Sequence, residues 1–252
     1  AMVGDMTTPP MGTGDLFIIG QGYDGAGTVT GDKNSGVSIG AAKDQTNTNT
    51  SSVSPTVFTA DGNLWITGIA TAEAASDENR GVEIDRAFVI NASTTAGKTL
   101  VIVGTGGQGS LDGTNRGVQV TGSVISSAAS TQATDVFITG KGGSGTGANN
   151  DGVAINISNT VLGGETAPVV TVASVTSGSG AIFITGDSGS GSVSRGVLIS
   201  GDNSTLTTPP ASIYSSVASV SGDITIEGTS NGTLANNNRG VQIQNSRVET
   251  GN

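Results

Sequence analysis

Leu100-Val101-Ile102-Val103-Gly104, followed a short way on by Asn115-Arg116-Gly117-Val118-Gln119-Val120, is the stretch of sequence that decides the fold. In each half, large aliphatic residues stand at alternate positions, a period that is typical of a β-strand with one buried face. The residues between the halves are rich in Gly, Asn and Ser, which favour turns. The stretch therefore predicts two short strands joined by a turn.

This two-part pattern occurs six times along the chain. The first part recurs at 16–20, 64–68, 100–104, 136–140, 182–186 and 224–228, and the second at 34–39, 79–84, 115–120, 150–155, 194–199 and 238–243. A third, weaker strand is expected a few residues later, with its best examples at 88–90, 124–125 and 247–249. The spacing between copies varies, so we expect loops of variable length, most of them between a third strand and the next first strand.

Repetition of a unit this small indicates a solenoid, because one unit cannot bury its apolar face alone and stacked units can. We predict an all-β fold, a right-handed parallel β-helix (β-solenoid) of about six rungs with three short strands per rung. At about 4.8 Å per rung, the stack would rise by about 25–30 Å. We expect residues 1–13 to be a lead-in with a cloning scar at Ala1 and Met2. Residues 14–252 are expected to form one repeat domain cut from a larger protein.

The composition removes several classes of function. The chain has neither Cys nor His, so disulfides, imidazole bases and most zinc or iron sites are not expected. Its net charge of −10 disfavours nucleic acid as a partner. Apolar runs are too short for a membrane-spanning helix, so this segment is not expected to insert into a membrane. The recurring Val, Ile and Leu positions argue against disorder, despite 41 glycines.

Stacked rungs would place equivalent residues in columns, and the first of these is a column of asparagines. Its members are Asn34, Asn79, Asn115, Asn150 and Asn238, with Ser194 in the fifth copy. We expect structural turn residues that tolerate left-handed backbone geometry and hydrogen-bond along the stack. The glycine two positions later is expected to be required for its backbone conformation as well; the column is Gly36, Gly81, Gly117, Gly152, Gly196 and Gly240.

The second column is rich in arginine. It contains Arg80, Arg116, Arg195 and Arg239, with Ser35 in the first copy and Asp151 in the fourth. One interpretation is a solvated corner in which Asp151 offsets the charges of Arg116 and Arg195. The other is a cationic ladder that binds acidic glycans or a partner protein, since guanidinium groups match carboxylate and sulfate.

A third column would stand on the outside of the first strands. It contains Phe17, Trp65, Phe137 and Phe183, with Val101 and Thr225 in the remaining copies. An exposed apolar stripe of this size is unusual for a monomer. Either the long inserts at 41–56, 163–180 and 201–216 fold over it, or it binds a sugar or a protein.

Motifs for other chemistry are weak. Two Gly-rich stretches, 20–25 and 104–109, match a dinucleotide-binding pattern, but no helix is expected after either, so we reject that site. No cofactor is expected. Calcium bound by loop carboxylates such as Asp24, Asp112 or Asp187 stays open. The acidic residues are scattered over different offsets, and no pair is specified for glycoside cleavage. We therefore do not expect an enzyme.

The alternation of 64–68 with 79–84, repeated along residues 14–250, resembles the repeats of giant secreted bacterial proteins of the filamentous-haemagglutinin-like or adhesin-like kind. The resemblance implies a β-helix rod at the bacterial cell surface, with a role in adhesion to glycans or to surface proteins of a neighbouring cell. Within a longer parent, neighbouring repeats would cover the ends of the stack. We expect a structural or adhesive module that acts as a stiff spacer or contact surface. The alternative is a carbohydrate-binding or carbohydrate-active β-helix.

Overall fold

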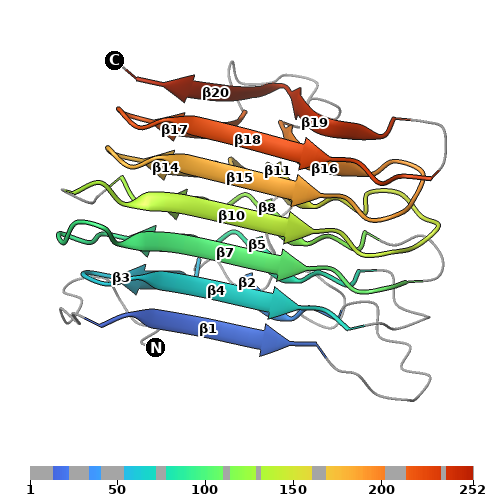
Figure 1. Cartoon of the computed structure of the whole chain (residues 1–252), viewed down its shortest axis with the longest axis horizontal. Helices are drawn as coiled ribbons and strands as arrows, with labels where there is room; N and C mark the ends of the chain where they lie inside the picture. Colours follow the sequence, from blue (N-terminus) through green and yellow to red (C-terminus); the bar gives the residue numbers. More distant parts are fainter. Residues whose placement is uncertain are drawn as a thin grey trace.

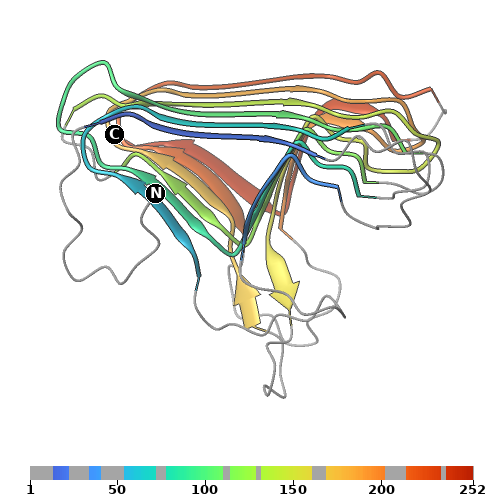
Figure 2. The ribbon, with the colours of Figure 1, turned by 90° about the horizontal axis from the view of Figure 1, so that it is seen from below.

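Three parallel sheets wind around one axis (Figures 1 and 2). The computed structural model describes residues 14–22, 34–40, 54–71, 78–109, 114–128, 132–160, 169–201, 214–233 and 237–251. Each rung contributes one strand to each sheet, in the order sheet 1, sheet 2, sheet 3. In Figure 1 the strands of sheet 1 run from left to right at the front while the chain climbs, so the winding is right-handed.

Sheet 1 is built from the first part of each repeat. Its strands are β1 (Leu16–Gln21), β4 (Leu64–Ile69), β7 (Thr99–Thr105), β10 (Asp135–Lys141), β15 (Ile182–Asp187) and β18 (Ile224–Thr229). All pairs are parallel and in register, so that Ile18 pairs with Ile66 and Ile66 with Ile102. The predicted column of isoleucines is confirmed.

Sheets 2 and 3 form the other two sides of the β-helix. Sheet 2 contains β2 (Val37–Gly40), β5 (Val82–Asp85), β8 (Val118–Thr121), β11 (Val153–Asn156), β16 (Arg195–Ser200) and β19 (Arg239–Gln244). Sheet 3 contains β3 (Thr56–Thr59), β6 (Phe88–Asn91), β9 (Val124–Ser126), β14 (Ser174–Ser177), β17 (Ser215–Ser219) and β20 (Ser246–Thr250). The prediction of six rungs with three strands each is confirmed.

The core is a stack of aliphatic layers between the three sheets. Inward side chains such as Leu100, Ile102, Val118 and Ile125 are wholly buried in the middle rungs. Burying one such side chain is worth about 1.5–3 kcal/mol, and each middle rung buries several. A single rung would expose these side chains on both sides, which is why the stack and not the rung is the stable unit.

The loops differ from the prediction in their place. The connections between the second and third strands of a rung vary most in length, with two residues at 86–87 against fifteen at 41–55, whereas third and first strands are joined by shorter turns such as 220–223. The error arose because several third strands, such as Ser174–Ser177, are too polar to stand out in the sequence. One long connection carries an antiparallel pair, β12 (Ser158–Thr160) and β13 (Val169–Thr171), which projects from the corner between sheets 2 and 3 (Figure 2).

Close approach of the backbone explains the glycine column, and the expected left-handed geometry is wrong. A Cβ on Gly117 would lie 2.3 Å from the backbone nitrogen of Lys141 and 2.6 Å from the carbonyl oxygen of Gly152. None of the six column glycines has a positive φ. Sheets 1 and 2 meet so closely at this corner that only hydrogen fits between them.

Candidate functional site

Polar side chains at the corner between sheets 1 and 2 form a ladder along the axis. The backbone N–H of Asn79 donates to Oδ1 of Asn115 at 3.1 Å, and that of Asn115 donates to Oδ1 of Asn150 at 3.0 Å. The side-chain amide of Asn115 donates in turn to the carbonyl of Ser144, one rung higher. Each of these asparagines is wholly buried, and Asn115 connects three successive rungs. The predicted hydrogen-bonded column is confirmed.

The column asparagines do not use the left-handed backbone geometry that this residue type tolerates. Two residues just before column members, Asn149 and Asn237, have positive φ angles of 66° and 65°. Asn150 and Asn238 themselves do not. In these two rungs the residue before the column asparagine makes the turn, and the column side chain reaches along the axis. The end members behave in the same way: Ser194 donates its backbone N–H to Oδ1 of Asn238 at 3.0 Å.

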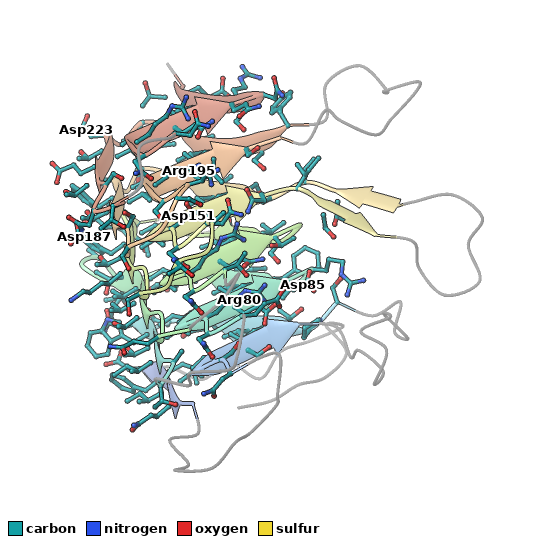
Figure 3. The ribbon with its side chains drawn as sticks, turned by 90° about the vertical axis from the view of Figure 1, so that its right-hand side faces the viewer. Arg80, Asp85, Asp151, Asp187, Arg195 and Asp223 are labelled. Atoms are coloured by element: carbon teal, nitrogen blue, oxygen red, sulfur yellow. The ribbon has the colours of Figure 1, made fainter. Side chains whose placement is uncertain are left out.

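The arginine column is a set of ion pairs within the chain. The Asp151 carboxylate is wholly buried between two guanidinium groups; Arg116 Nε lies 3.1 Å from Oδ2 and Arg195 Nη1 lies 3.2 Å from Oδ1. The predicted offset of these charges by Asp151 is confirmed. Burial lowers the pKa of the Arg116 guanidinium, and the attraction of Asp151 raises it only in part. Figure 3 shows Asp151 and Arg195 one above the other on this side of the molecule.

The expectation of a solvated corner is wrong for most of this column. Arg80 is buried and pairs with Glu83, at 2.6 Å, and with Glu78, at 2.9 Å. Only Arg239, on the last rung, is exposed. Paired and buried guanidinium groups present little charge to an incoming anion, so this geometry gives little support to a cationic ladder for acidic glycans. The sequence analysis missed both glutamates; Glu83 follows Arg80 by three residues, a spacing that brings their side chains to the same outer corner.

The aromatic column stands on the outer face of sheet 1, as predicted. Phe17 is 51% exposed, while Trp65, Phe137 and Phe183 are half-buried. Two pairs of rings are in contact: the centroids of Phe17 and Trp65 lie 4.6 Å apart, and those of Phe137 and Phe183 lie 4.9 Å apart with the rings nearly parallel. Of the inserts expected to cover this face, residues 41–53, 161–168 and 202–213 lie outside the described residues.

Stacking along the column limits what these rings can bind. A sugar that binds an aromatic side chain lies flat on the ring face. In the Phe137–Phe183 pair, each ring has one face against its neighbour. Beside these rings, the outer face presents aliphatic side chains such as Ile19 and Ile69, both exposed. This face suits an apolar contact better than a sugar-binding platform.

A second polar ladder runs along the start of the sheet 1 strands. The Asp15 carboxylate accepts the backbone N–H of Asn63 at 2.8 Å, and Asn63 accepts that of Thr99 at 3.0 Å. Higher in the stack, Asp135 accepts the backbone N–H of Ala181 at 2.8 Å. These bonds lower the pKa of Asp15, chiefly through the backbone N–H of Asn63. The sequence analysis did not identify this ladder because its members are not of one residue type.

Candidate metal ligands do not cluster in the part of the chain that the structure describes. There, no group of three or more His, Cys, Asp or Glu side chains is placed to hold a metal ion. Asp187 lies at the exposed end of β15, and Asp24 and Asp112 lie outside the described residues. Calcium binding and the expected absence of catalysis therefore stay as predictions from the sequence alone.

The comparisons with known proteins give no family. No protein-family model, curated protein or solved structure matches the chain. Among the described residues, no helix is long and apolar enough to cross a membrane. Function therefore has to be argued from the geometry of the columns.

Proposed function

We propose that the chain is a stiff structural module of a bacterial cell-surface protein, which acts as a spacer and offers the outer face of sheet 1 as a contact surface. The observation that carries this proposal is the use of the polar columns. The Asn79–Asn115–Asn150 ladder is buried, the Arg116–Asp151–Arg195 cluster is largely buried, and both bond one rung to the next. Side chains engaged in this way stiffen the stack and are not available to a ligand.

The contact surface follows from what the ladders leave exposed. Along the outer face of sheet 1, Phe17, Ile19 and Ile69 are exposed, and the half-buried Trp65 lies between them. The face is formed by strands in register, so it repeats at about 4.8 Å and is rigid. A rigid apolar face of this kind fits adhesion to an apolar surface of a partner protein.

A glycan array tests this proposal against its alternative. We expect the purified chain to show no glycan binding that depends on Trp65. Binding that is lost in Trp65→Ala but kept in Ile69→Ala would contradict the spacer proposal. It would instead support the carbohydrate-binding alternative, with the Phe17–Trp65 pair and the neighbouring Asn63 as the site.

A further inference from the structure

The two ends of the stack are complementary in their backbone groups. In sheets 1 and 2, inward residues donate to the following rung: Leu16 to the carbonyl of Asn63, and Val82 to that of Gly117. In sheet 3, outward residues donate to the preceding rung, as Val124 does to Ala87. Because backbone groups alternate in direction along a strand, every sheet follows one rule. Inward residues direct their N–H and C=O toward the C-terminal end, and outward residues direct theirs toward the N-terminal end.

The last rung exposes what the inner rungs bury. The edge strands at this end are β18, β19 and β20, and Val241, Ile243 and Val248 are 38%, 48% and 37% exposed. Their partners one rung below are Val197, Ile199 and Val217, which are wholly buried. By the rule above, the inward residues of the last rung direct their backbone groups away from the stack.

The first rung matches this surface in every inward column. Its strands β1, β2 and β3 are the edge strands at the other end (Figure 1). Register places Leu16 and Ile18 in the columns of Ile224 and Ile226, and Val37, Ile39 and Val57 in those of Val241, Ile243 and Val248. The outward residues Phe17 and Ile19 direct their backbone groups toward a rung that would precede them.

We propose that the last rung binds the first rung of a second copy of this chain, head to tail, and so continues the β-helix across the junction. This contact would continue the five rung-to-rung interfaces inside the chain, with the same strand direction, register and column residues. The inference depends on the fold alone and not on the proposed function. A head-to-tail contact does not close on itself, so it generates a linear series of oligomers and not a single dimer.

One pair of like charges opposes this contact. In a stacked pair, Asp15 of one copy would lie in the column of Asp223 of the other. Inside the chain, the equivalent neighbours of Asp15 and Asp135 are Asn63 and Ala181, so no aspartates are adjacent there. Asp223→Asn removes the repulsion. Its side-chain oxygen would accept the backbone N–H of Asp15 in the second copy, as Oδ1 of Asn63 accepts that of Thr99. We expect the substitution to tighten association by about two- to five-fold.

Sedimentation velocity of the whole chain, from about 1 µM to about 500 µM, tests the proposal. Wild type should form oligomers that lengthen with concentration. Ile243→Lys places a charge on the last rung and should weaken association by about ten-fold or more. Ile19→Pro removes an N–H that points away from β4, and should block the first rung while leaving the bonds within the chain intact. Circular dichroism checks that each variant is folded.

Two control variants change exposed isoleucine side chains without removing a backbone donor at either end of the stack. Ile69→Lys changes an inner strand of sheet 1, and Ile19→Thr keeps the backbone donor of the first rung. Both should associate like wild type. If either control abolished association, the outer face and not the ends would be the interface, and the proposal would be overturned.

Mixing the two blocked variants gives the sharpest result. Ile243→Lys retains an intact first rung and Ile19→Pro retains an intact last rung. Each should be monomeric alone, and the equimolar mixture should form dimers and nothing longer. A wild-type chain that stays monomeric at every concentration, or a mixture that gives no dimer, would overturn the proposal.

Discussion

The backbone N–H of Asn115 donates to Oδ1 of Asn150, a residue one rung higher, at 3.0 Å, and both residues are wholly buried. A buried N–H without a partner costs free energy comparable to a lost hydrogen bond. The partner here comes only from the neighbouring rung. The column therefore ties the fold of each rung to the presence of the next, and the same bond recurs between Asn79 and Asn115.

Loss of one ladder member should destabilise its neighbour as well. Asn115→Ala leaves the backbone N–H of Asn79 buried without its acceptor and removes the bond to Ser144. We expect the free energy of unfolding to fall by about 2 kcal/mol. Denaturant unfolding followed by circular dichroism measures it. Asn156→Ala, on the outer face of β11, is the matched control and should change stability by less than about 0.5 kcal/mol.

Removal of the buried Asp151 carboxylate should cost more than removal of an exposed charge. Asp151→Asn leaves the guanidinium groups of Arg116 and Arg195 facing each other without a counter-charge. We expect a loss of about 3–5 kcal/mol in the free energy of unfolding. Arg239→Gln, in the same column but exposed, should change it by less than about 1 kcal/mol. Equal losses for the two variants would show that the Asp151 cluster contributes no more than a surface pair.

A methyl group at the corner between sheets 1 and 2 should not be tolerated. Gly117→Ala would force its Cβ against the backbone of both Lys141 and Gly152, and neither can move without breaking strand pairing. We expect a loss of about 3 kcal/mol or more, measured as a fall in the denaturant midpoint. Gly14→Ala, where a Cβ meets no atom within 4 Å, is the control and should leave the midpoint unchanged.

Acid should weaken the turn between sheets 3 and 1. The Asp61 carboxylate accepts the hydroxyls of Ser93, at 2.8 Å, and Thr95, at 3.0 Å, and these bonds hold its pKa below the ordinary value of 3.8. A lowered pKa means that the carboxylate stabilises the fold above pH 3.8 and that this contribution is lost as the pH falls toward the folded-state pKa.

Asp61→Asn should therefore lose stability less steeply than wild type between about pH 5 and pH 2. Thermal unfolding across this range measures the slope. Asp187→Asn removes one negative charge from an exposed strand end and controls for the change in net charge. An Asp61→Asn slope equal to that of wild type would contradict a role for these hydroxyl bonds in stability.

The sequence was sufficient for the architecture because the repeat is strong where the core is made. Ile66, Ile102 and Ile138 recur within identical strand patterns, and strand register follows directly from their alignment. The third strands were harder to place. Strands such as Ser174–Ser177 carry one inward aliphatic residue among hydroxyls, and this is too little to separate a strand from a loop. The long loops were consequently assigned to the wrong corner.

The positions of the candidate columns were predicted from the sequence, but the contacts of their side chains were not. The alternation of inward and outward residues was enough to place Trp65 and Phe137 outside and the arginines at a corner. The pairing of Arg80 with Glu83 was missed, because the column was considered as arginines alone and not with the acid three residues further on. Ring stacking between Phe137 and Phe183 depends on side-chain rotation, which a sequence pattern does not specify.

Because the chain has no cysteine, spin labels can be attached at two introduced cysteines alone. This gives the most direct test of the in-register β-helix. Ile19 and Glu227 lie in one outer column, five rungs apart, although more than two hundred residues separate them in the sequence. Spin labels on Ile19→Cys and Glu227→Cys, measured in excess unlabelled chain, should give one narrow distance distribution near 24 Å, which is about five rises of 4.8 Å. A broad distribution would contradict the stack and with it every column described above. So would a mean distance that differs from about 24 Å by more than the length of the two label side chains allows.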